Sequence, residues 1–211
     1  MSNWEANAMF VRTIYVTGDP TKIDTAVRAL NSEGRDLLEE RPGYRGAGVF
    51  VDRELGKLLG VSQWDTPQQR HSSDMVMREH RASMLGPFAG TLTVENFEAV
   101  VRHSVQAPRV GGGLSVTRVE FDPADADLFA DTFRSSALPR YETLPGVARA
   151  VLLVDREHGT GRVGILFTDR DSMAASRGGQ AAARHEGAAK AHVRVVGLEE
   201  FEVVHADGHL D

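Results

Sequence analysis

Val51-Asp52-Arg53-Glu54 and Val154-Asp155-Arg156-Glu157 are the same tetrapeptide, found twice in the chain at a displacement of 103 positions. Other segments keep this displacement, namely Asp19-Pro20 with Asp122-Pro123, Pro42-Gly43 with Pro145-Gly146, and Gly56 with Gly159. A register that holds over several short segments indicates an internal duplication, because unrelated turn sequences do not keep a fixed spacing. The chain is therefore predicted to contain two copies of one structural unit.

The spacing between the copies grows by one residue in the later part of each copy. Asp65 is matched with Asp169 at a displacement of 104, and the same displacement relates Glu95-Asn96-Phe97-Glu98 to Glu199-Glu200-Phe201-Glu202. The second copy is thus predicted to carry one inserted residue before Asp169.

Each copy is predicted to fold in the order strand, helix, strand, strand, helix, strand. Segments rich in Val, Ile, Thr and aromatic residues are typical of strands, and a capping side chain before a proline is typical of a helix start. In the first copy, strands are expected at 10–17, 44–52, 57–64 and 91–101, with one helix from Asp19-Pro20 to Pro42-Gly43 and another from Thr66-Pro67 to Gly86-Pro87. The second copy repeats this with strands at 114–121, 147–154, 162–168 and 193–204, and with helices from Pro123 and at 172–190.

The order βαββαβ is that of a ferredoxin-like unit, which assigns the chain to the α+β class. The first unit is expected to span residues 1–105 and the second residues 106–211, with a linker at 104–113 that contains Pro108 and three successive glycines. Because the helices of such a unit cover one face of its sheet, the other face needs a partner. The two sheets are therefore expected to meet within the chain as a tandem, eight-stranded α/β barrel.

Composition limits the function classes. The 211-residue chain carries a formal net charge of -6 and has no run of Lys and Arg, so we expect no nucleic-acid partner. It contains no cysteine, which excludes disulfides and thiolate chemistry. We expect no membrane span, because no apolar run is long enough, and a cytoplasmic location, because Met1 to Met9 lacks the pattern of a secretory signal.

Four segments carry a resemblance to a known family. They are Arg41-Pro42-Gly43-Tyr44, Phe50-Val51-Asp52-Arg53, Ser62-Gln63-Trp64-Asp65-Thr66 and Glu95-Asn96-Phe97-Glu98. With these segments the chain resembles the dimeric α/β barrel superfamily, in the tandem form of the antibiotic-biosynthesis monooxygenase domain. The resemblance covers nearly the whole chain, and its motifs are structural, so it implies the fold more directly than an activity.

The resemblance implies a cofactor-free monooxygenase, or a related catalyst, that acts on an aromatic or polyketide-like small molecule. In such oxygenases a pocket between sheet and helices deprotonates a phenol, and the resulting carbanion reacts with oxygen. The alternative is a non-catalytic barrel that binds a small molecule or is purely structural. Convergence of the candidate residues on a cavity on the order of a few hundred Å³ would favour the enzyme, whereas Met and Leu side chains filling that space would favour the alternative.

The candidate catalytic residues are His80, Trp64 and Tyr15, and Asn96 is the candidate substrate-binding residue. His80 is the expected base because the imidazole pKa lies near neutral pH. The N–H groups of Trp64 and Asn96 are expected to hold the substrate oxygen. Each residue also has a structural interpretation, with Trp64 and Tyr15 as packing residues, His80 as a half-exposed histidine and Asn96 as a residue that faces water.

The second copy differs at these positions. The matched pairs are Tyr15 with Arg118, Asn96 with Glu200, and Trp64 with Thr168 or Phe167, depending on the displacement. His185 lies near the match of His80. Because the neutral donors occur only in the first copy, the first is expected to be the active half and the second the supporting half.

No cofactor and no metal are expected. The histidines and carboxylates form no ligand motif, and the glycine runs lack the spacing of a phosphate loop. Haem-degrading members of the family carry an Asn on the first strand and a Trp in a helix, and this chain has neither, so we expect no haem. The expected partner is a small molecule, and pairing of the whole chain into a homodimer stays open.

Overall fold

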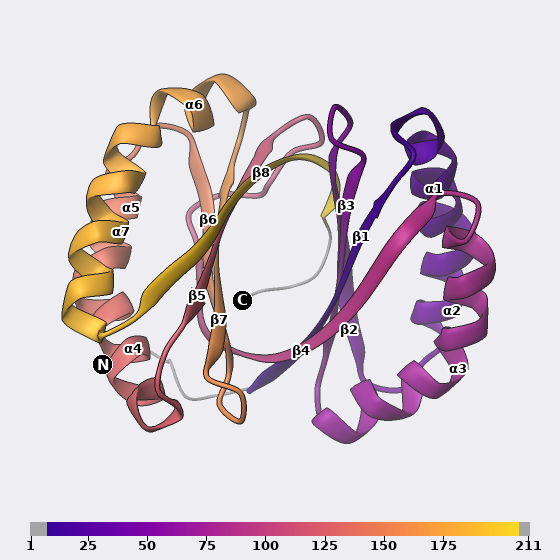
Figure 1. Ribbon diagram of the computed structural model, residues 1–211, viewed down its shortest axis with the longest axis horizontal. Coiled ribbons are helices and arrows are strands. Elements are labelled where there is room, and N and C mark those ends of the chain that lie inside the picture. The colour runs from indigo at the N-terminus through magenta and orange to yellow at the C-terminus, as the bar shows by residue number, and fades with distance from the viewer. Residues whose placement is uncertain (1–7, 207–211) are drawn as a thin grey trace. The chain divides into compact units, whose positions relative to one another are not determined.

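The computed structural model describes residues 8–206 of the chain (Figure 1). Most of the amino-terminal segment considered above, Met1 to Met9, lies outside this range. Contacts divide the described part into two compact units, residues 8–96 with 204–206 and residues 97–203. Each unit has its own antiparallel strands, with helices along one face of them (Figure 1).

The first repeat has the predicted order of elements. They are β1 (Met9–Gly18), α1 (Ile23–Ala29), α2 (Arg35–Glu39), β2 (Tyr44–Asp52), β3 (Lys57–Trp64), α3 (Pro67–Leu85) and β4 (Ala89–Ser104). β3 lies between β1 and β2 and pairs with both in antiparallel fashion. The order of elements confirms the predicted βαββαβ unit.

The second repeat has the same order. Its elements are β5 (Gly113–Glu120), α4 (Ala126–Thr132), α5 (Leu138–Glu142), β6 (Val147–Asp155), β7 (Thr160–Phe167), α6 (Arg170–Ala175), α7 (Arg177–Ala191) and β8 (Arg194–Ala206). β7 pairs with β5 and β6, and β5 also pairs with β8. The strand order β1-β3-β2-β8-β5-β7-β6-β4 is that of a closed barrel, which confirms the predicted α+β class.

The two compact units do not coincide with the two sequence repeats. The last part of β4, Glu98 to Ser104, pairs with β6 and belongs to the second unit. The end of β8, residues 204–206, belongs to the first unit. Residues 105–112 connect β4 to β5, where the glycine-containing linker was expected.

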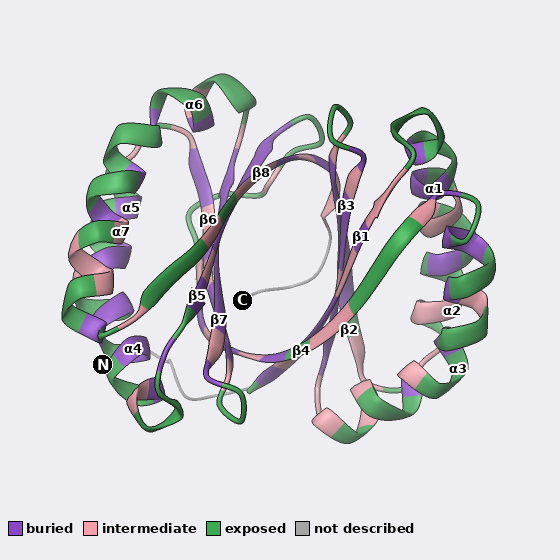
Figure 2. Cartoon of the chain, viewed as in Figure 1, coloured by how far each residue is buried: buried purple, intermediate pink, exposed green. Residues whose placement is uncertain are grey.

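Strand alternation gives the sheet of the first unit two faces. β1 and β3 pair with Phe10 opposite Trp64, and every second residue along each strand shares that side. Val16 lies on the same side and packs with Ile23 of α1 in the core. Figure 2 shows buried residues along β2 and β3 and exposed residues on the outer side of the helices that cover them. The side of Phe10, Trp64 and Val16 is therefore the helix-covered face, and Tyr15 lies on the opposite face.

The first predicted helix of each copy is interrupted. Asp19 caps its start as predicted, with its carboxylate accepting a hydrogen bond from the Thr21 N–H at 3.0 Å. A turn of π-helix at Leu30–Gly34 then separates α1 from α2, and Phe133–Ala137 forms the same turn between α4 and α5. A π turn holds more residues than an α turn, and apolar spacing over so short a helix does not reveal it.

Strand pairing settles which residue of the second copy corresponds to Trp64. Gly113 lies opposite Phe167 in the β5–β7 pair, as Phe10 lies opposite Trp64 in the β1–β3 pair. Both pairs of residues are related by a displacement of 103, so Trp64 corresponds to Phe167 rather than to Thr168.

The predicted match of Asp65 with Asp169 is wrong. The Asp65 N–H donates to the Gly43 carbonyl at 2.9 Å, and the Thr168 N–H makes the equivalent bond to the Gly146 carbonyl at 2.8 Å. Asp65 therefore corresponds to Thr168, still at a displacement of 103.

The start of the second helix still keeps the displacement of 103, because its capping residues Thr66 and Asp169 are related by it. On this displacement His80 corresponds to Ala183 and not to His185. Farther along, β8 contains a β-bulge, since Val119 of β5 lies opposite Val195 and Arg118 opposite Gly197, which leaves Val196 unpaired with β5.

We expect Thr66→Ala to lower the free energy of unfolding by about 1 kcal/mol, because Thr66 is the cap of α3. Its hydroxyl accepts a hydrogen bond from the Gln69 N–H at 3.2 Å. Urea denaturation of the wild type, Thr66→Ala and the control Thr66→Ser, which keeps the hydroxyl, measures the effect. Equal stability of all three proteins would contradict the assignment of the cap.

Candidate functional site

Trp64 lies at the end of β3 and is completely buried. Its indole N–H donates to the Ser62 hydroxyl at 3.1 Å, and the Tyr44 ring contacts the indole edge-on at 5.7 Å between ring centres. The structure therefore places the Trp64 N–H in a bond within the protein.

The other three sequence candidates lie apart from Trp64. Tyr15 is half-buried on the opposite face of the sheet. His80 is half-exposed on α3, with its Nδ1 3.7 Å from Oε1 of Glu33. Asn96 is exposed on β4. None of the four candidates lines the cavity of the first unit, and the assignment of these residues to a site stays a prediction.

The first unit contains a cavity of about 60 Å³ between its sheet and its helices. The polar residues of its wall are Arg12, Asn31, Arg35, Ser62, Arg81 and His205. The apolar part of the wall includes Ile14, Leu30, Leu38, Val49, Met77 and Met84. Leu30 and Gly34 of the π turn both line the cavity, so this helix irregularity forms part of its wall.

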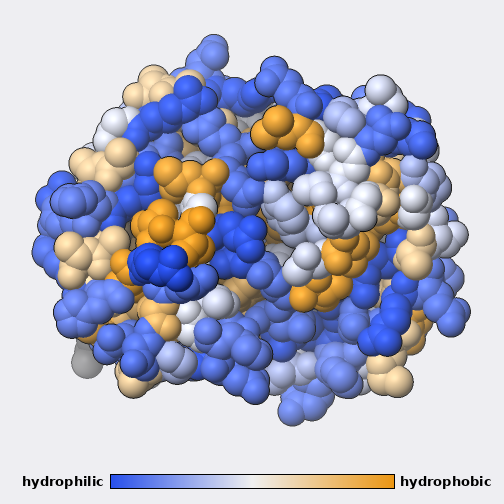
Figure 3. All heavy atoms as spheres, viewed as in Figure 1, coloured by the Kyte–Doolittle hydropathy of each residue, from blue (hydrophilic) through white to orange (hydrophobic). Residues whose placement is uncertain are grey.

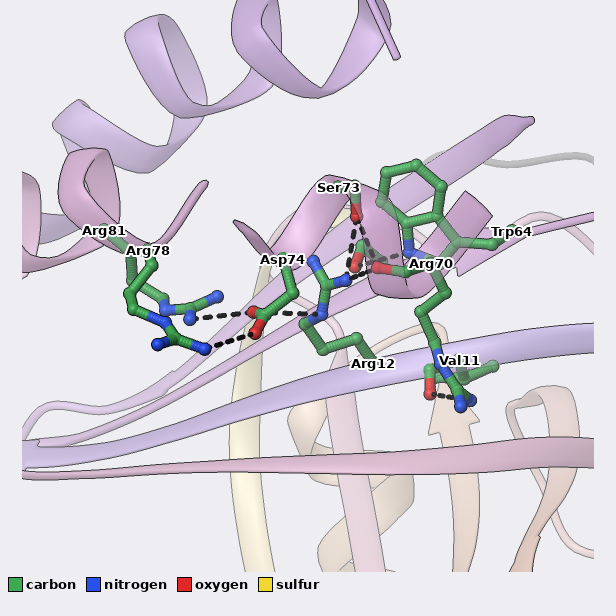
Figure 4. A network of polar contacts seen from close by, with 9 residues as sticks. Val11, Arg12, Trp64, Arg70, Ser73, Asp74, Arg78 and Arg81 are labelled. Carbon is green, nitrogen blue, oxygen red and sulfur yellow. Dashed lines mark hydrogen bonds and ion pairs between the residues drawn. The ribbon is translucent and has the colours of Figure 1, made fainter. Parts of the chain in front are cut away.

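Arg12 is the most unusual residue of this cavity, because its charged side chain is only 3% exposed. One Nη donates to the Ser73 hydroxyl at 2.8 Å and to the Arg70 carbonyl (Figure 4). The guanidinium also lies 5.5 Å from the centre of the Trp64 ring, within the range of a cation–π contact. Its Nε has no hydrogen-bond partner within residues 8–206.

Asp74 of α3 is the carboxylate that pairs with three arginines, Arg12, Arg78 and Arg81 (Figure 4). Its Oδ1 accepts a hydrogen bond from Arg81 at 2.9 Å and lies 3.6 Å from Nε of Arg12, while Oδ2 lies 3.8 Å from Arg78. One carboxylate thus faces three guanidinium groups. The cluster keeps an excess of positive charge beside the cavity.

Burial lowers the pKa of Arg12 to about 10, against the opposing effect of the nearby Asp74 carboxylate. Arg12 therefore remains protonated at neutral pH. Burial alone would raise the pKa of Asp74, but the hydrogen bond from Arg81 and the charges of Arg81, Arg12 and Arg78 outweigh it and hold that pKa below its ordinary value.

The second repeat fills the corresponding space. At a displacement of 103, the wall residues Arg12, Leu30, Leu38, Gly60 and Ser62 become Ser115, Phe133, Tyr141, Val163 and Ile165. Four of these five changes add apolar bulk, and the fifth removes the buried charge. The hollow between sheet and helices in the second unit measures about 30 Å³. The two copies have therefore diverged at this cavity.

Sequence reasoning missed the residues that line the cavity. Arg12 shares its strand and its parity with Ile14 and Val16, so alternation along β1 was a usable signal for its burial. Arg81 follows Met77 by four residues on α3 and thus lies on the same helix face. His205 comes from the far end of the chain, and no local pattern connects it with β1.

Within residues 8–206 there is no group of three His, Cys, Asp or Glu side chains that could hold a metal ion. None of the helices in this range is long and apolar enough to cross a membrane.

Comparison with known proteins gives relatives without an assigned activity. No family model matches the chain. Two uncharacterized proteins of Mycobacterium tuberculosis (strain H37Rv) are similar to it. Rv2557 is 27% identical over 169 residues, which covers 80% of this chain and 75% of the relative, and Rv2558 is 26% identical over 206 residues, which covers 96% and 85%.

Solved structures establish the fold. An anthrone oxidase-like protein superposes with a TM-score of 0.70 at 15% identity, over 97% of this chain and 94% of that one. A monooxygenase-like protein from Listeria innocua superposes with a TM-score of 0.56 at 7% identity, over 96% and 98%. The chain has the dimeric α/β barrel fold. At these identities the likeness concerns the fold alone.

Asp74→Asn is expected to lower the free energy of unfolding by about 2 kcal/mol at pH 7, because the buried Arg12 and Arg81 lose the carboxylate that they share. Asp131→Asn is the control, because Asp131 forms an exposed pair with Arg134 at 2.9 Å and should matter by less than about 0.5 kcal/mol. Because the folded-state pKa of Asp74 is lowered, its stabilisation is complete above the unfolded-state pKa, near 4, and is lost as the pH falls through the folded-state pKa. Denaturation at pH 7, 4 and 2.5 should show the difference between wild type and Asp74→Asn shrinking, and a constant difference would contradict it.

Proposed function

We propose that the first repeat binds a small aromatic or polyketide-like molecule as its phenolate or enolate, with Arg12 as the group that stabilises the negative charge. The observation that carries this proposal is the buried, protonated Arg12 in the wall of a mostly apolar cavity. A guanidinium in such a place lowers the pKa of a bound phenol, because the charge interaction is weakly screened there. The apolar wall suits a hydrocarbon ring.

The proposed reaction is cofactor-independent oxygenation. A base takes the proton, the carbanion form of the substrate gives electrons to O2, and a CH2 group next to the ring becomes a carbonyl with release of one water molecule. The substrate supplies the electrons, so the balance needs no other reductant. The likeness in fold to an anthrone oxidase-like protein and a monooxygenase-like protein supports this reaction class.

His205 is the base we propose for this reaction, because it is the histidine among the residues that line the cavity. Arg12 would then stabilise the negative charge of the substrate, and His205 would accept its proton. The earlier candidate, His80, is a competing assignment that the same experiment tests.

The size of the cavity limits the proposal. About 60 Å³ is well below the roughly 300 Å³ of a small-ligand pocket, so binding requires the wall to open. Met77 and Met84 are flexible side chains of that wall, and the π turn lies beside them, so these are the elements we expect to repack.

The small volume also favours a second candidate, a non-catalytic barrel whose cavity is filled by its own methionines. In that case polycyclic phenols neither bind nor consume oxygen with this protein. Ligand binding without oxygen consumption would support a binding protein and contradict the oxygenase.

The test is oxygen consumption with anthrone, which reacts through its enol form, and with a panel of polycyclic phenols. We expect Arg12→Met to lower kcat/KM about 100-fold or more, and His205→Ala to lower it about 100-fold, with His80→Ala and His185→Ala near wild type. Loss in His80→Ala with full activity in His205→Ala would reverse the assignment of the base. Full activity in Arg12→Met would remove the role of Arg12.

A cavity-filling variant tests the place of the site without removing a charge. Leu30→Phe installs in the first repeat the residue that the second repeat has at Phe133, and it should abolish binding of the phenols while the protein stays folded. Leu55→Phe is the control, because Leu55 is 63% exposed in the β2–β3 turn. Equal binding by Leu30→Phe and Leu55→Phe, measured by fluorescence titration, would place the site elsewhere.

A further inference from the structure

We propose that the second repeat carries a separate binding site for a hydrophobic monocarboxylate, in the groove between α7 and the start of β8. This site is independent of the function proposed for the first repeat. It lies entirely within the second compact unit.

The groove measures about 450 Å³ and is open to the surface. Its apolar lining comes from Ala181, Ala188, Ala189, Val193 and Val195. Its two basic residues are the half-buried Arg184 and the exposed His185, which are adjacent on α7. The groove thus combines a small apolar surface with one fixed positive charge.

Arg184 stands where three hollows meet. It lines the open groove, a neighbouring hollow of about 340 Å³ beside Gln180 and Leu198, and the buried hollow of about 30 Å³ beside Phe133. The open groove and the buried hollow also share Ala188, Val193 and Val195. An apolar chain that starts at Arg184 can therefore lie along Ala188, Val193 and Val195 in the open groove.

The duplication explains why this guanidinium is available. At the displacement of 103, Arg184 corresponds to Arg81, whose charge is met by Asp74. The second copy has Arg177 where the first has Asp74, so the carboxylate is lost. No hydrogen bond or ion pair joins Arg184 to another side chain in the part of the chain that the structure describes.

The nearby carboxylate of Glu200 pairs with Arg177 and not with Arg184. Glu200 is already held by Arg177, whose Nε donates to its carboxylate at 2.8 Å. The charge of Arg184 still contributes to lowering the pKa of Glu200, after the hydrogen bond from Arg177 and against the effect of burial. Arg184 therefore lies near that pair without forming part of it.

The chemistry of the groove selects the ligand class. A single guanidinium suits a monoanionic carboxylate, which it can bind through two parallel hydrogen bonds. The apolar wall suits an alkyl or aryl body, and hydrophobic side chains gather over the first half of β8 (Figure 3). Val195, Val196 and Leu198 account for exposed apolar groups there, at 39%, 41% and 56%. A ligand body on this surface would cover them.

The test is calorimetric titration of the full chain with hexanoate, octanoate and decanoate. We expect affinity to rise by up to about fourfold per methylene, as burial of the chain predicts. Arg184→Gln should weaken decanoate at least tenfold, and Val195→Asp, which adds a negative charge to the exposed wall, should weaken it as well. Lys190→Gln should bind as wild type. Lys190 lies on the same helix but does not line the groove, and its Nζ lies 2.6 Å from Oε1 of Glu186.

Three further outcomes would overturn the proposal. Arg12→Met should keep wild-type affinity for decanoate, and loss of binding in that variant would overturn the proposal by moving the ligand to the first cavity. Wild-type affinity in Arg184→Gln, with circular dichroism that shows a folded protein, would also overturn it. Competition by inorganic phosphate at the same concentration as decanoate would overturn the proposal too, because the site would then bind anions in general.

Discussion

The antiparallel pairing of β1 with β3 is the constraint on which the first half of the molecule depends. With Phe10 fixed opposite Trp64, the alternation of side chains places Arg12 on the helix-covered face. A guanidinium in that layer is costly unless charge and hydrogen bonds accompany it. The Asp74 carboxylate, the Ser73 hydroxyl and the Trp64 ring lie around the guanidinium, and because Ser73 and Asp74 belong to α3, these contacts join α3 to the sheet.

The fold was largely predictable because turn and cap signals are local. Asp19-Pro20 and Thr66-Pro67 mark helix starts by their own side chains, and the repeat of such signals shows the duplication without any knowledge of packing. The π turn at Leu30–Gly34 was not predictable in this way, because it changes the spacing of apolar residues by too little over a short helix. The inserted residue was placed too early because sequence identity, unlike strand pairing, does not register a bulge such as that at Val196.

The candidate site was less predictable because its residues were chosen by chemical type rather than by face. Tyr15 and Trp64 both suit a substrate oxygen, but their positions in the β1–β3 pairing put them on opposite sides of the sheet. Composition does not single out Arg12, because a charged side chain is usually exposed, although its parity with Val16 places it on the inner face. The hydrogen bond from the Trp64 N–H to the Ser62 hydroxyl depends on the rotamers of two side chains in one strand, and no sequence pattern specifies these rotamers.

The π turns bear on the history of the chain. Leu30–Gly34 and Phe133–Ala137 occupy equivalent places in the two copies, so the irregularity was present in the single-copy ancestor before duplication. In both copies the turn borders a hollow between helices and sheet, which indicates that the ancestor already had one there. One descendant hollow acquired or kept a buried cation, while the other was closed by aromatic side chains. After the duplication the same inherited space thus took two different forms, a cavity beside a buried cation in the first copy and a nearly filled core in the second.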